Sequence, residues 1–319
     1  NFNMYLTRFV NKTKIKKVIL LLFFFPIRLF FYIFFKPRVN QILFISFDGL
    51  TYSCNPKAIY DFIIKNHPNE FQLFWAFRKD FDFNSLPTHV NAVKVGTIKY
   101  YKILTTSNFL ISNTRLSPLN RKWKNKPRYY IQTWHGTALK KIERDAMTTL
   151  PKHWIKMAQK DSKLCNLMIS GSKYHTSTIR NAMWYKGEIL EIGTPRNDIF
   201  FITNNSIRNN FDLNFGTKPN QKLVLYAPTF RLNYYKNTYF LDPEILIHSL
   251  KYKFGGEWKL LVRFHPNLLN KNYKELFNFT HNSVIDVTKY NDMHELLYIS
   301  DILITDVSSS IFDFSILKR

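Results

Sequence analysis

Two groups of polar residues stand directly after β-forming runs, where side chains could do chemistry. The first is His135-Gly136-Thr137, which follows the run 129–134. A strand that stops at His-Gly delivers an imidazole to a sheet edge, where α/β proteins place ligand crevices. Gly136 would let a substrate or the backbone approach closely. An imidazole near its unperturbed pKa suits a general base at neutral pH, and the alternative interpretation is a core or capping histidine beside a turn glycine.

The second group gathers at the ends of three strands in the last third of the chain. These strands end in Pro228-Thr229, in His265-Pro266 preceded by Arg263, and in Asp306-Val-Ser-Ser-Ser310. Carboxyl ends of parallel strands meet at one sheet edge. Serine hydroxyls and free N–H groups at a helix start suit a diphosphate, and His265 with Arg263 adds donors. Simple N-capping by the serines is the alternative.

The elements that would position the first group alternate between strand and helix. The predicted strands are 41–47, 71–77, 91–95, 109–112, 129–134, 166–170 and 187–192. The predicted helices are 58–65, 97–106, 151–164 and 172–184, and the lysine-rich segment 136–145 also has helical potential. Asn55-Pro56 is read as an N-cap followed by proline at the first helical position. This alternation predicts a parallel, doubly wound sheet.

A second α/β unit is predicted to position the second group. Its predicted strands are 222–231, 259–266, 284–287 and 301–305, and its helices begin at 242–243, 293 and 306–310. The asparagine-rich stretch 202–220 is the best candidate for a linker between domains. The predicted domains are a membrane-associating segment 1–38, an N-terminal Rossmann-like domain 39–205 and a C-terminal nucleotide-binding domain 206–319.

Composition narrows the classes of partner. The 319 residues include 46 Lys+Arg against 22 Asp+Glu, a net charge of +24 that favours polyanionic partners. Nucleic acid is disfavoured because there is no arginine-rich helix, zinc finger or RNA-binding aromatic signature. Cys54 and Cys165 form no disulfide framework and are expected to be buried thiols. The basic stretch 115–128 is either a solvated loop or a surface for a polyphosphate acceptor. No acidic pair compels a metal, so no cofactor is required and a divalent ion is left open.

The N-terminal segment predicts membrane association. Residues 18–35 are apolar apart from Pro26 and Arg28, with basic residues on both sides. A charge inside the run is costly in a bilayer, which favours a helix in the membrane interface with its basic flanks on anionic headgroups. A single membrane span is the alternative.

Five motifs in order carry a family resemblance. They are Thr133-Trp-His-Gly-Thr137 with Leu139-Lys140 and Asp145, Gly193-x-Pro-Arg-Asn-Asp198, Tyr226-Ala-Pro-Thr-Phe230, Arg263-x-His-Pro266 and Asp306-x-Ser-Ser309. Over residues 41–319 the chain resembles the CDP-glycerol:poly(glycerophosphate) glycerophosphotransferases, the polymerases and primases of teichoic acids and related capsules. The resemblance implies a GT-B-like α/β fold, with two Rossmann-like domains whose parallel sheets face a cleft. Family members continue past Arg319, which implies a truncated C-terminal domain, and Ala138 stands where proline is usual.

The resemblance also implies roles for individual residues. His135 matches the catalytic base and Asp145 belongs to the same catalytic motif, while Asn197 and Asp198 cap a helix or lock the linker. On the acceptor side the implied residues are Gly136, Thr137 and Lys140. The implied donor-binding residues are Pro228, Thr229, Arg231, Arg263, His265, Asp306, Ser308 and Ser309.

The implied reaction is transfer of glycerol phosphate, or a related polyol phosphate, from a CDP-activated donor to a hydroxyl of a lipid-linked or polymeric acceptor, with release of CMP. The expected location is the cytoplasmic face of the bacterial cell membrane, with the protein peripheral or monotopic on its anionic surface. Two alternatives stay open: another GT-B enzyme that uses a nucleotide sugar, and an inactive member that only binds.

Overall fold

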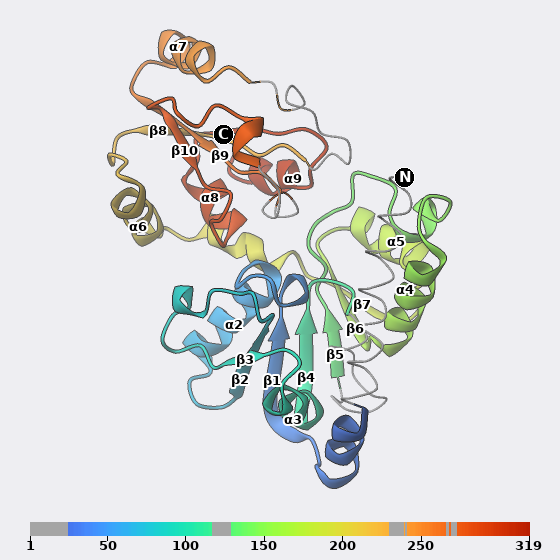
Figure 1. Ribbon diagram of the computed structural model, residues 1–319. Helices are drawn as coiled ribbons and strands as arrows, with labels where there is room; N and C mark the ends of the chain where they lie inside the picture. The colour runs from blue at the N-terminus through green and yellow to red at the C-terminus, as the bar shows by residue number, and fades with distance from the viewer. Residues whose placement is uncertain (1–24, 117–128, 230–238, 240, 266–267, 269–272) are drawn as a thin grey trace, which may run out of the picture. The chain divides into compact units, whose positions relative to one another are not determined.

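The computed structural model describes residues 25–116, 129–229, 239, 241–265, 268 and 273–319 (Figure 1). The chain divides into two compact units. Unit 1 comprises residues 1–135 and 142–194, and unit 2 comprises residues 136–141 and 195–319. The predicted boundary at 205–206 stays a proposal, because this division runs through the Gly193–Asp198 motif and places the segment after His135 with unit 2.

Unit 1 is built on a seven-stranded parallel sheet with the order β3-β2-β1-β4-β5-β6-β7 (Figure 1). The strands are β1 (Arg38–Ile45), β2 (Gln72–Phe77), β3 (Ala92–Lys94), β4 (Ser107–Ser112), β5 (Tyr129–Gln132), β6 (Leu167–Ser170) and β7 (Glu188–Glu191). The predicted parallel sheet is therefore confirmed. Strand order reverses between β1 and β4, and in doubly wound sheets ligands bind at the carboxyl ends beside that reversal.

The helices of unit 1 lie between these strands, as predicted. They are α2 (Cys54–Asn66), α3 (Ile98–Thr106), α4 (Lys152–Leu164) and α5 (Lys173–Ala182). Three short 3-10 helices are η1 (Phe47–Gly49), η2 (Phe83–Ser85) and η3 (Glu143–Ala146). The side chains of Thr97 and Ser172 cap α3 and α5 by accepting backbone N–H bonds.

Two local predictions are wrong. The lysine-rich segment after His135 forms no α-helix, and only η3 appears at its end. Asn55 is not the N-cap of α2, because Ser53 holds that position and Asn55 lies inside the first turn. Its side chain instead makes long-range bonds that bear on the functional site.

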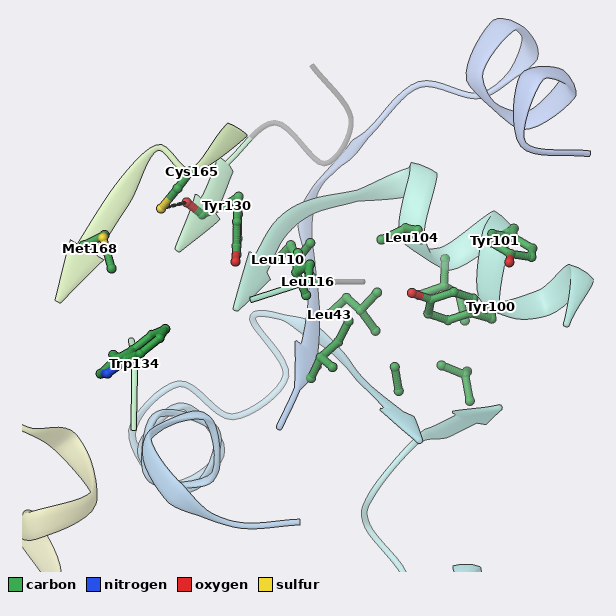
Figure 2. Close-up of a cluster of buried hydrophobic side chains, with 14 of the residues drawn as sticks. Leu43, Tyr100, Tyr101, Leu104, Leu110, Leu116, Tyr130, Trp134, Cys165 and Met168 are labelled. Carbon is green, nitrogen blue, oxygen red and sulfur yellow. Dashed lines mark hydrogen bonds between the residues drawn. The ribbon is translucent and has the colours of Figure 1, made fainter. Parts of the chain in front are cut away.

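Aromatic and aliphatic side chains fill both faces of the unit 1 sheet. Figure 2 shows part of one cluster, in which Leu43, Leu110 and Tyr130 come from neighbouring strands and Tyr100 and Leu104 from α3. Trp134 and Cys165 belong to the same cluster, and burial raises the pKa of the Cys165 thiol to about 12. Both cysteines are buried thiols outside any disulfide, as predicted.

Residues 25–34 are helical, and one face of this helix joins the unit 1 core. Phe31 is buried there, and Ile27 and Phe35 pack beside it. The Arg28 guanidinium lies 5.6 Å from the Tyr101 ring centroid, and burial lowers its pKa. Residues 1–24 of the predicted membrane segment lie outside the described residues. Within the described part of the chain, no helix is long and apolar enough to cross a bilayer.

Unit 2 is built on a four-stranded parallel sheet with the order β10-β9-β8-β11. Its strands are β8 (Lys222–Tyr226), β9 (Trp258–Val262), β10 (Val284–Asp286) and β11 (Ile302–Ile304). Its helices are α6 (Asn205–Phe215), α7 (Pro243–Phe254), α8 (Met293–Ile299) and α9 (Ser310–Ser315), with 3-10 helices η4 (Pro195–Phe201) and η6 (Tyr273–Leu276). Two parallel sheets, one in each unit, confirm the α/β class.

The stretch 202–220 is not an irregular linker, because α6 occupies most of it. Phe211 of α6 is fully buried in the core of unit 2, against Leu223 and Leu225 of β8. Gly216 ends the helix with a left-handed conformation, φ 67°, which glycine adopts without steric cost. Asn205, Asn209, Asn210 and Asn214 therefore lie on a helix that packs on unit 2.

Candidate functional site

His135 lies just beyond β5, beside the reversal of strand order in unit 1. Its Nδ1 is 2.7 Å from the backbone oxygen of Asn113, which follows β4. The imidazole stacks on the Trp134 ring, with centroids 4.5 Å apart and 29° between planes. The Phe47 ring, from the loop after β1, lies 5.6 Å from it on centroids. Loops after β1, β4 and β5 therefore fix the ring.

The bond to Asn113 sets the tautomer of His135. A carbonyl oxygen only accepts, so Nδ1 must carry the hydrogen, and the neutral ring keeps its lone pair on Nε2. The Asn113 side chain is buried, accepts the Phe47 N–H at 2.8 Å and donates to Ser46 Oγ at 3.3 Å. A half-buried imidazole with a basic Nε2 has the form that a general base requires.

The backbone N–H and the carbonyl of Trp134, the residue directly before His135, are both hydrogen-bonded. Trp134 has φ 52°, in the left-handed region that residues other than glycine seldom adopt. Its N–H donates to Gln132 Oε1 at 3.0 Å, and its carbonyl accepts from Asn55 Nδ2 at 2.9 Å. Asn55 Nδ2 also donates to the Thr133 carbonyl at 3.1 Å.

Two buried acidic residues, Glu143 and Asp161, lie close to Trp134 through their shared partner Arg115. Arg115 pairs with Glu143 at 3.2 Å and with Asp161 at 3.3 Å, and all three side chains are buried. Its guanidinium lies 5.8 Å from the Trp134 ring centroid. Burial raises the pKa of Glu143, and Arg115 partly offsets that effect. Asp145 is exposed on η3, and no bond between its carboxylate and His135 occurs in the described part of unit 1. A catalytic role for Asp145 stays an untested proposal.

In unit 2, Thr229 and Asp306 meet at the point where strand order reverses. The Thr229 N–H donates to Asp306 Oδ1 and its hydroxyl to Oδ2, each at 2.9 Å. Thr229 follows β8 and Asp306 follows β11, so the pair ties together the two strand ends beside the reversal. Pro228 is buried next to it. Both oxygens of the Asp306 carboxylate therefore bond to Thr229 of the same protein. Direct donor binding by Asp306 stays a proposal.

His265 and Arg263 leave β9 in different environments. His265 as a whole is exposed to solvent, but part of its ring is buried. This burial, followed by the positive charges of Arg263 and Lys140, lowers the pKa of His265. Arg263 Nη1 donates to the backbone oxygens of Val287 at 3.3 Å and Tyr290 at 2.5 Å. Burial lowers the pKa of Arg263 to about 10. Arg263 therefore holds the loop between β10 and α8, and donor binding by His265 stays a proposal.

The serine turn after β11 lies close to Gly136. Ser308 and Ser310 share a hydroxyl–hydroxyl bond of 2.9 Å, while Ser309 makes no side-chain capping bond to α9. Gly136 has φ 137°, and a β-carbon there would lie 2.5 Å from Ser309 Oγ and 3.0 Å from Arg196 Nη2. Glycine at 136 is thus required both by its conformation and by this approach. Thr137 is half-buried and Lys140 exposed on the same segment.

A buried carboxylate holds α9 to the Gly193–Asp198 motif. Asp313 accepts from Arg196 at 2.6 Å, from Asn197 at 2.9 Å and from His294 Nε2 at 3.3 Å. Burial alone would raise the pKa of Asp313, but these three partners more than offset it and the pKa is lowered. The sequence analysis assigns no role to Arg196 or Asp313, although Arg196 lies within the motif Pro195-Arg-Asn-Asp198.

Two predicted features cannot be placed. Arg231, predicted to bind the donor, lies outside the described residues, as does the proline after His265. Over the ranges that the structure describes, no group of three or more histidine, cysteine, aspartate or glutamate side chains could hold a metal ion. The need for a divalent ion stays open.

Comparison with known proteins decides the family. The family model described as CDP-Glycerol:Poly(glycerophosphate) glycerophosphotransferase matches residues 28–319. The chain belongs to this family. The predicted resemblance is thereby confirmed. A Teichoic acid poly(glycerol phosphate) polymerase of Staphylococcus epidermidis is 36% identical over 89% of the chain, and one of Bacillus spizizenii is 35% identical over 89%.

Relatives in the family differ in length. The chain spans 40% of the S. epidermidis relative and 73% of the B. spizizenii one. Among solved structures, that of the Wall Teichoic Acid Polymerase TagF matches with a TM-score of 0.77 and 30% identity, covering 98% of this chain and 78% of that one. The likeness supports a TagF-like, GT-B-like α/β fold in the glycerophosphotransferase family.

Proposed function

We propose that this glycerophosphotransferase-family protein transfers glycerol phosphate from CDP-glycerol to a hydroxyl of a teichoic acid acceptor. The observation that carries the proposal is His135, held with Nδ1–H on a backbone carbonyl and Nε2 basic. The two polymerase relatives, named for poly(glycerol phosphate), favour glycerol over another polyol. Poly(glycerol phosphate) or its lipid-linked start is the corresponding acceptor.

The proposed chemistry is an in-line displacement at phosphorus. The acceptor hydroxyl oxygen forms a bond to the β-phosphorus of CDP-glycerol while the bond from that phosphorus to the bridging oxygen breaks. CMP leaves with the electron pair of that bond. The hydroxyl proton passes to His135 Nε2, the ring nitrogen that carries the lone pair when Nδ1 carries the hydrogen.

Unit 2 supplies the proposed donor site. His265 faces solvent with its pKa lowered, so it is mostly neutral before the donor arrives and can gain a proton beside a diphosphate. Ser308 and Ser309 stand at the carboxyl edge, where strand order reverses and α/β sheets bind ligands. We place Thr229 and Asp306 as the brace beneath this site. Arg231 stays a candidate donor contact, and Lys140 adds positive charge near His265.

Product analysis tests the proposed function. The protein is incubated with CDP-glycerol and a poly(glycerol phosphate) acceptor, and CMP release and acceptor growth are measured together. Release of CMP in step with chain growth is expected. Release of UDP from UDP-sugars, with none of CMP from CDP-glycerol, would favour the nucleotide-sugar alternative. Binding of CDP-glycerol without any transfer would favour the inactive alternative.

We also propose that the protein lies on the membrane surface through the helix at 25–34. One face of this helix packs on unit 1, and its other face exposes Phe25, Phe30, Ile33 and Phe34. An apolar face of this kind, in a chain with net charge +24, suits the interface of an anionic membrane. The cytoplasmic leaflet is the proposed location, since CDP-linked donors are made inside the cell.

A further inference from the structure

The loop that carries His135 has an unfavourable backbone conformation. Trp134, directly before the histidine, has φ 52° although its side chain is a large aromatic ring. Non-glycine residues in this region persist only where their surroundings hold them, and such residues cluster at functional sites. A change in the Trp134 backbone would redirect His135, because the two residues share a peptide bond. Whatever holds Trp134 therefore aims the imidazole.

One restraint on Trp134 comes from a residue distant in sequence. Asn55 Nδ2 donates to the carbonyls of Trp134 at 2.9 Å and Thr133 at 3.1 Å. Asn55 is 1% exposed, so water cannot replace its amide there without opening the site. It lies in the first turn of α2, after Cys54, whose own φ is 67°. The chain entering α2 is thus also held in an uncommon conformation.

The other side of the Trp134 peptide is held locally. Gln132 Oε1 accepts the Trp134 N–H at 3.0 Å, and Gln132 Nε2 donates to Thr114 O and Tyr130 Oη, each at 2.8 Å. Gln132 is only two residues before Trp134 and lies on β5 itself, so it would move together with that strand. Asn55 alone of these two ties the turn to another secondary-structure element.

We propose that Asn55 is a positioning residue for the proposed base, holding the left-handed turn at Trp134 so that His135 keeps its Nδ1–H on Asn113. The inference rests on the proposed function for its effect on rate. Its geometric part, the tautomer and orientation of His135, can be measured without any turnover.

The mutational test compares Asn55→Ala with Asn66→Ala at the other end of α2. Asn66 is exposed and donates only locally, to Phe62 O at 2.9 Å. A misplacement of about 1 Å can cost on the order of a hundredfold in rate, so kcat of N55A should fall about 10- to 100-fold. KM for CDP-glycerol should stay within about twofold, because the proposed donor site lies on unit 2. N66A should behave as the wild type.

A double-mutant cycle separates positioning from general weakening. If Asn55 acts through His135, N55A should cause no further loss in the H135A background. An equal fold-loss in both backgrounds, or an unchanged kcat in N55A alone, would overturn the proposal. Thermal melts of all variants confirm that rates are compared on folded protein.

A spectroscopic measurement stands independently of activity. With 15N-histidine labelling, the His135 ring signals are assigned by their loss in H135A, and the wild type should show a protonated Nδ1 and an unprotonated Nε2. N55A should lose this single tautomer, while N66A keeps it. If N55A does not fold, Asn55→Leu has about the same size but no donor, and it should show the same loss. An unaltered tautomer in the folded variants refutes the inference. Absence of turnover in the wild type would refute only the proposed function.

Discussion

The affinity for CDP-glycerol should depend on pH through His265. Burial and the charges of Arg263 and Lys140 lower the pKa of this histidine in the free protein. The diphosphate keeps its negative charge near neutral pH and favours the imidazolium, so binding should raise that pKa. By linkage, affinity is greatest at low pH and falls as pH rises from the free-state pKa to the bound-state pKa. The slope cannot exceed about tenfold per pH unit for one proton.

Removing the imidazole should cost more at low pH than at high pH. A hydrogen bond to a charged group contributes about 1.5–3 kcal/mol, so at pH 6 His265→Ala should weaken binding by at least about tenfold. At pH 8 the imidazole is neutral and only the diphosphate carries charge, so the loss should be smaller than at pH 6. His248→Ala, which removes an exposed histidine of α7 in the same unit, is the matched control.

Calorimetry in buffers of different ionisation enthalpy provides the assay. It measures the dissociation constant and the number of protons taken up as CDP-glycerol binds. The wild type should take up a fraction of a proton near pH 7, and H265A none of that fraction. Equal proton uptake by wild type and H265A, or equal affinities, would show that His265 does not meet the diphosphate.

Three further predictions concern the base, the α9 brace and the membrane. His135→Ala should lower kcat by about 10²–10⁴ while donor affinity by calorimetry stays near that of the wild type; full turnover would return His135 to a structural role. Asp313→Ala should destabilise unit 2 by about 3–5 kcal/mol, because the buried Arg196 loses its counter-ion, whereas the apolar pair Arg196→Met with Asp313→Leu should recover much of this in thermal melts. The same ion pair should contribute fully above the ordinary carboxyl pKa and fade as pH falls through the lowered pKa of Asp313, so equal acid sensitivity of wild type and the apolar pair would contradict it. Alkaline carbonate or high salt should release much of the protein from anionic vesicles if the attachment is interfacial, and resistance to both would point to a spanning segment.

The regular elements could be predicted from the sequence because their signals are local. Runs such as Ile42–Ile45 are wholly apolar, as expected for strands buried on both faces of a parallel sheet. The caps at Thr97, Ser172 and Asp242 follow directly from residue type. Placing His135, Thr229 and Asp306 at strand ends needed only the alternation of strands and helices.

The supports of the site could not be predicted, because they depend on contacts between distant residues. Asn55-Pro56 has the local signature of a cap, but the Asn55 amide is used on carbonyls 78 and 79 residues away in sequence. Arg263 stands near His265 in the motif, yet its guanidinium donates hydrogen bonds to backbone oxygens in the loop after β10. The asparagine content of 202–220 suggests a linker. The structure instead has a helix there, because the apolar spacing buries Phe211 in the core of unit 2.

The docked helix at 25–34 has a thermodynamic consequence for membrane attachment. A segment that folds only on reaching a bilayer loses about 1–2 kcal/mol of backbone entropy per residue at that moment. Here Phe31 is already buried in unit 1 and Arg28 already lies against Tyr101, so the helix is ordered before any lipid is met. Little of the free energy gained by inserting Phe30 and Phe34 would be spent on ordering this helix. Preorganisation of this kind lets a small apolar face give reversible binding.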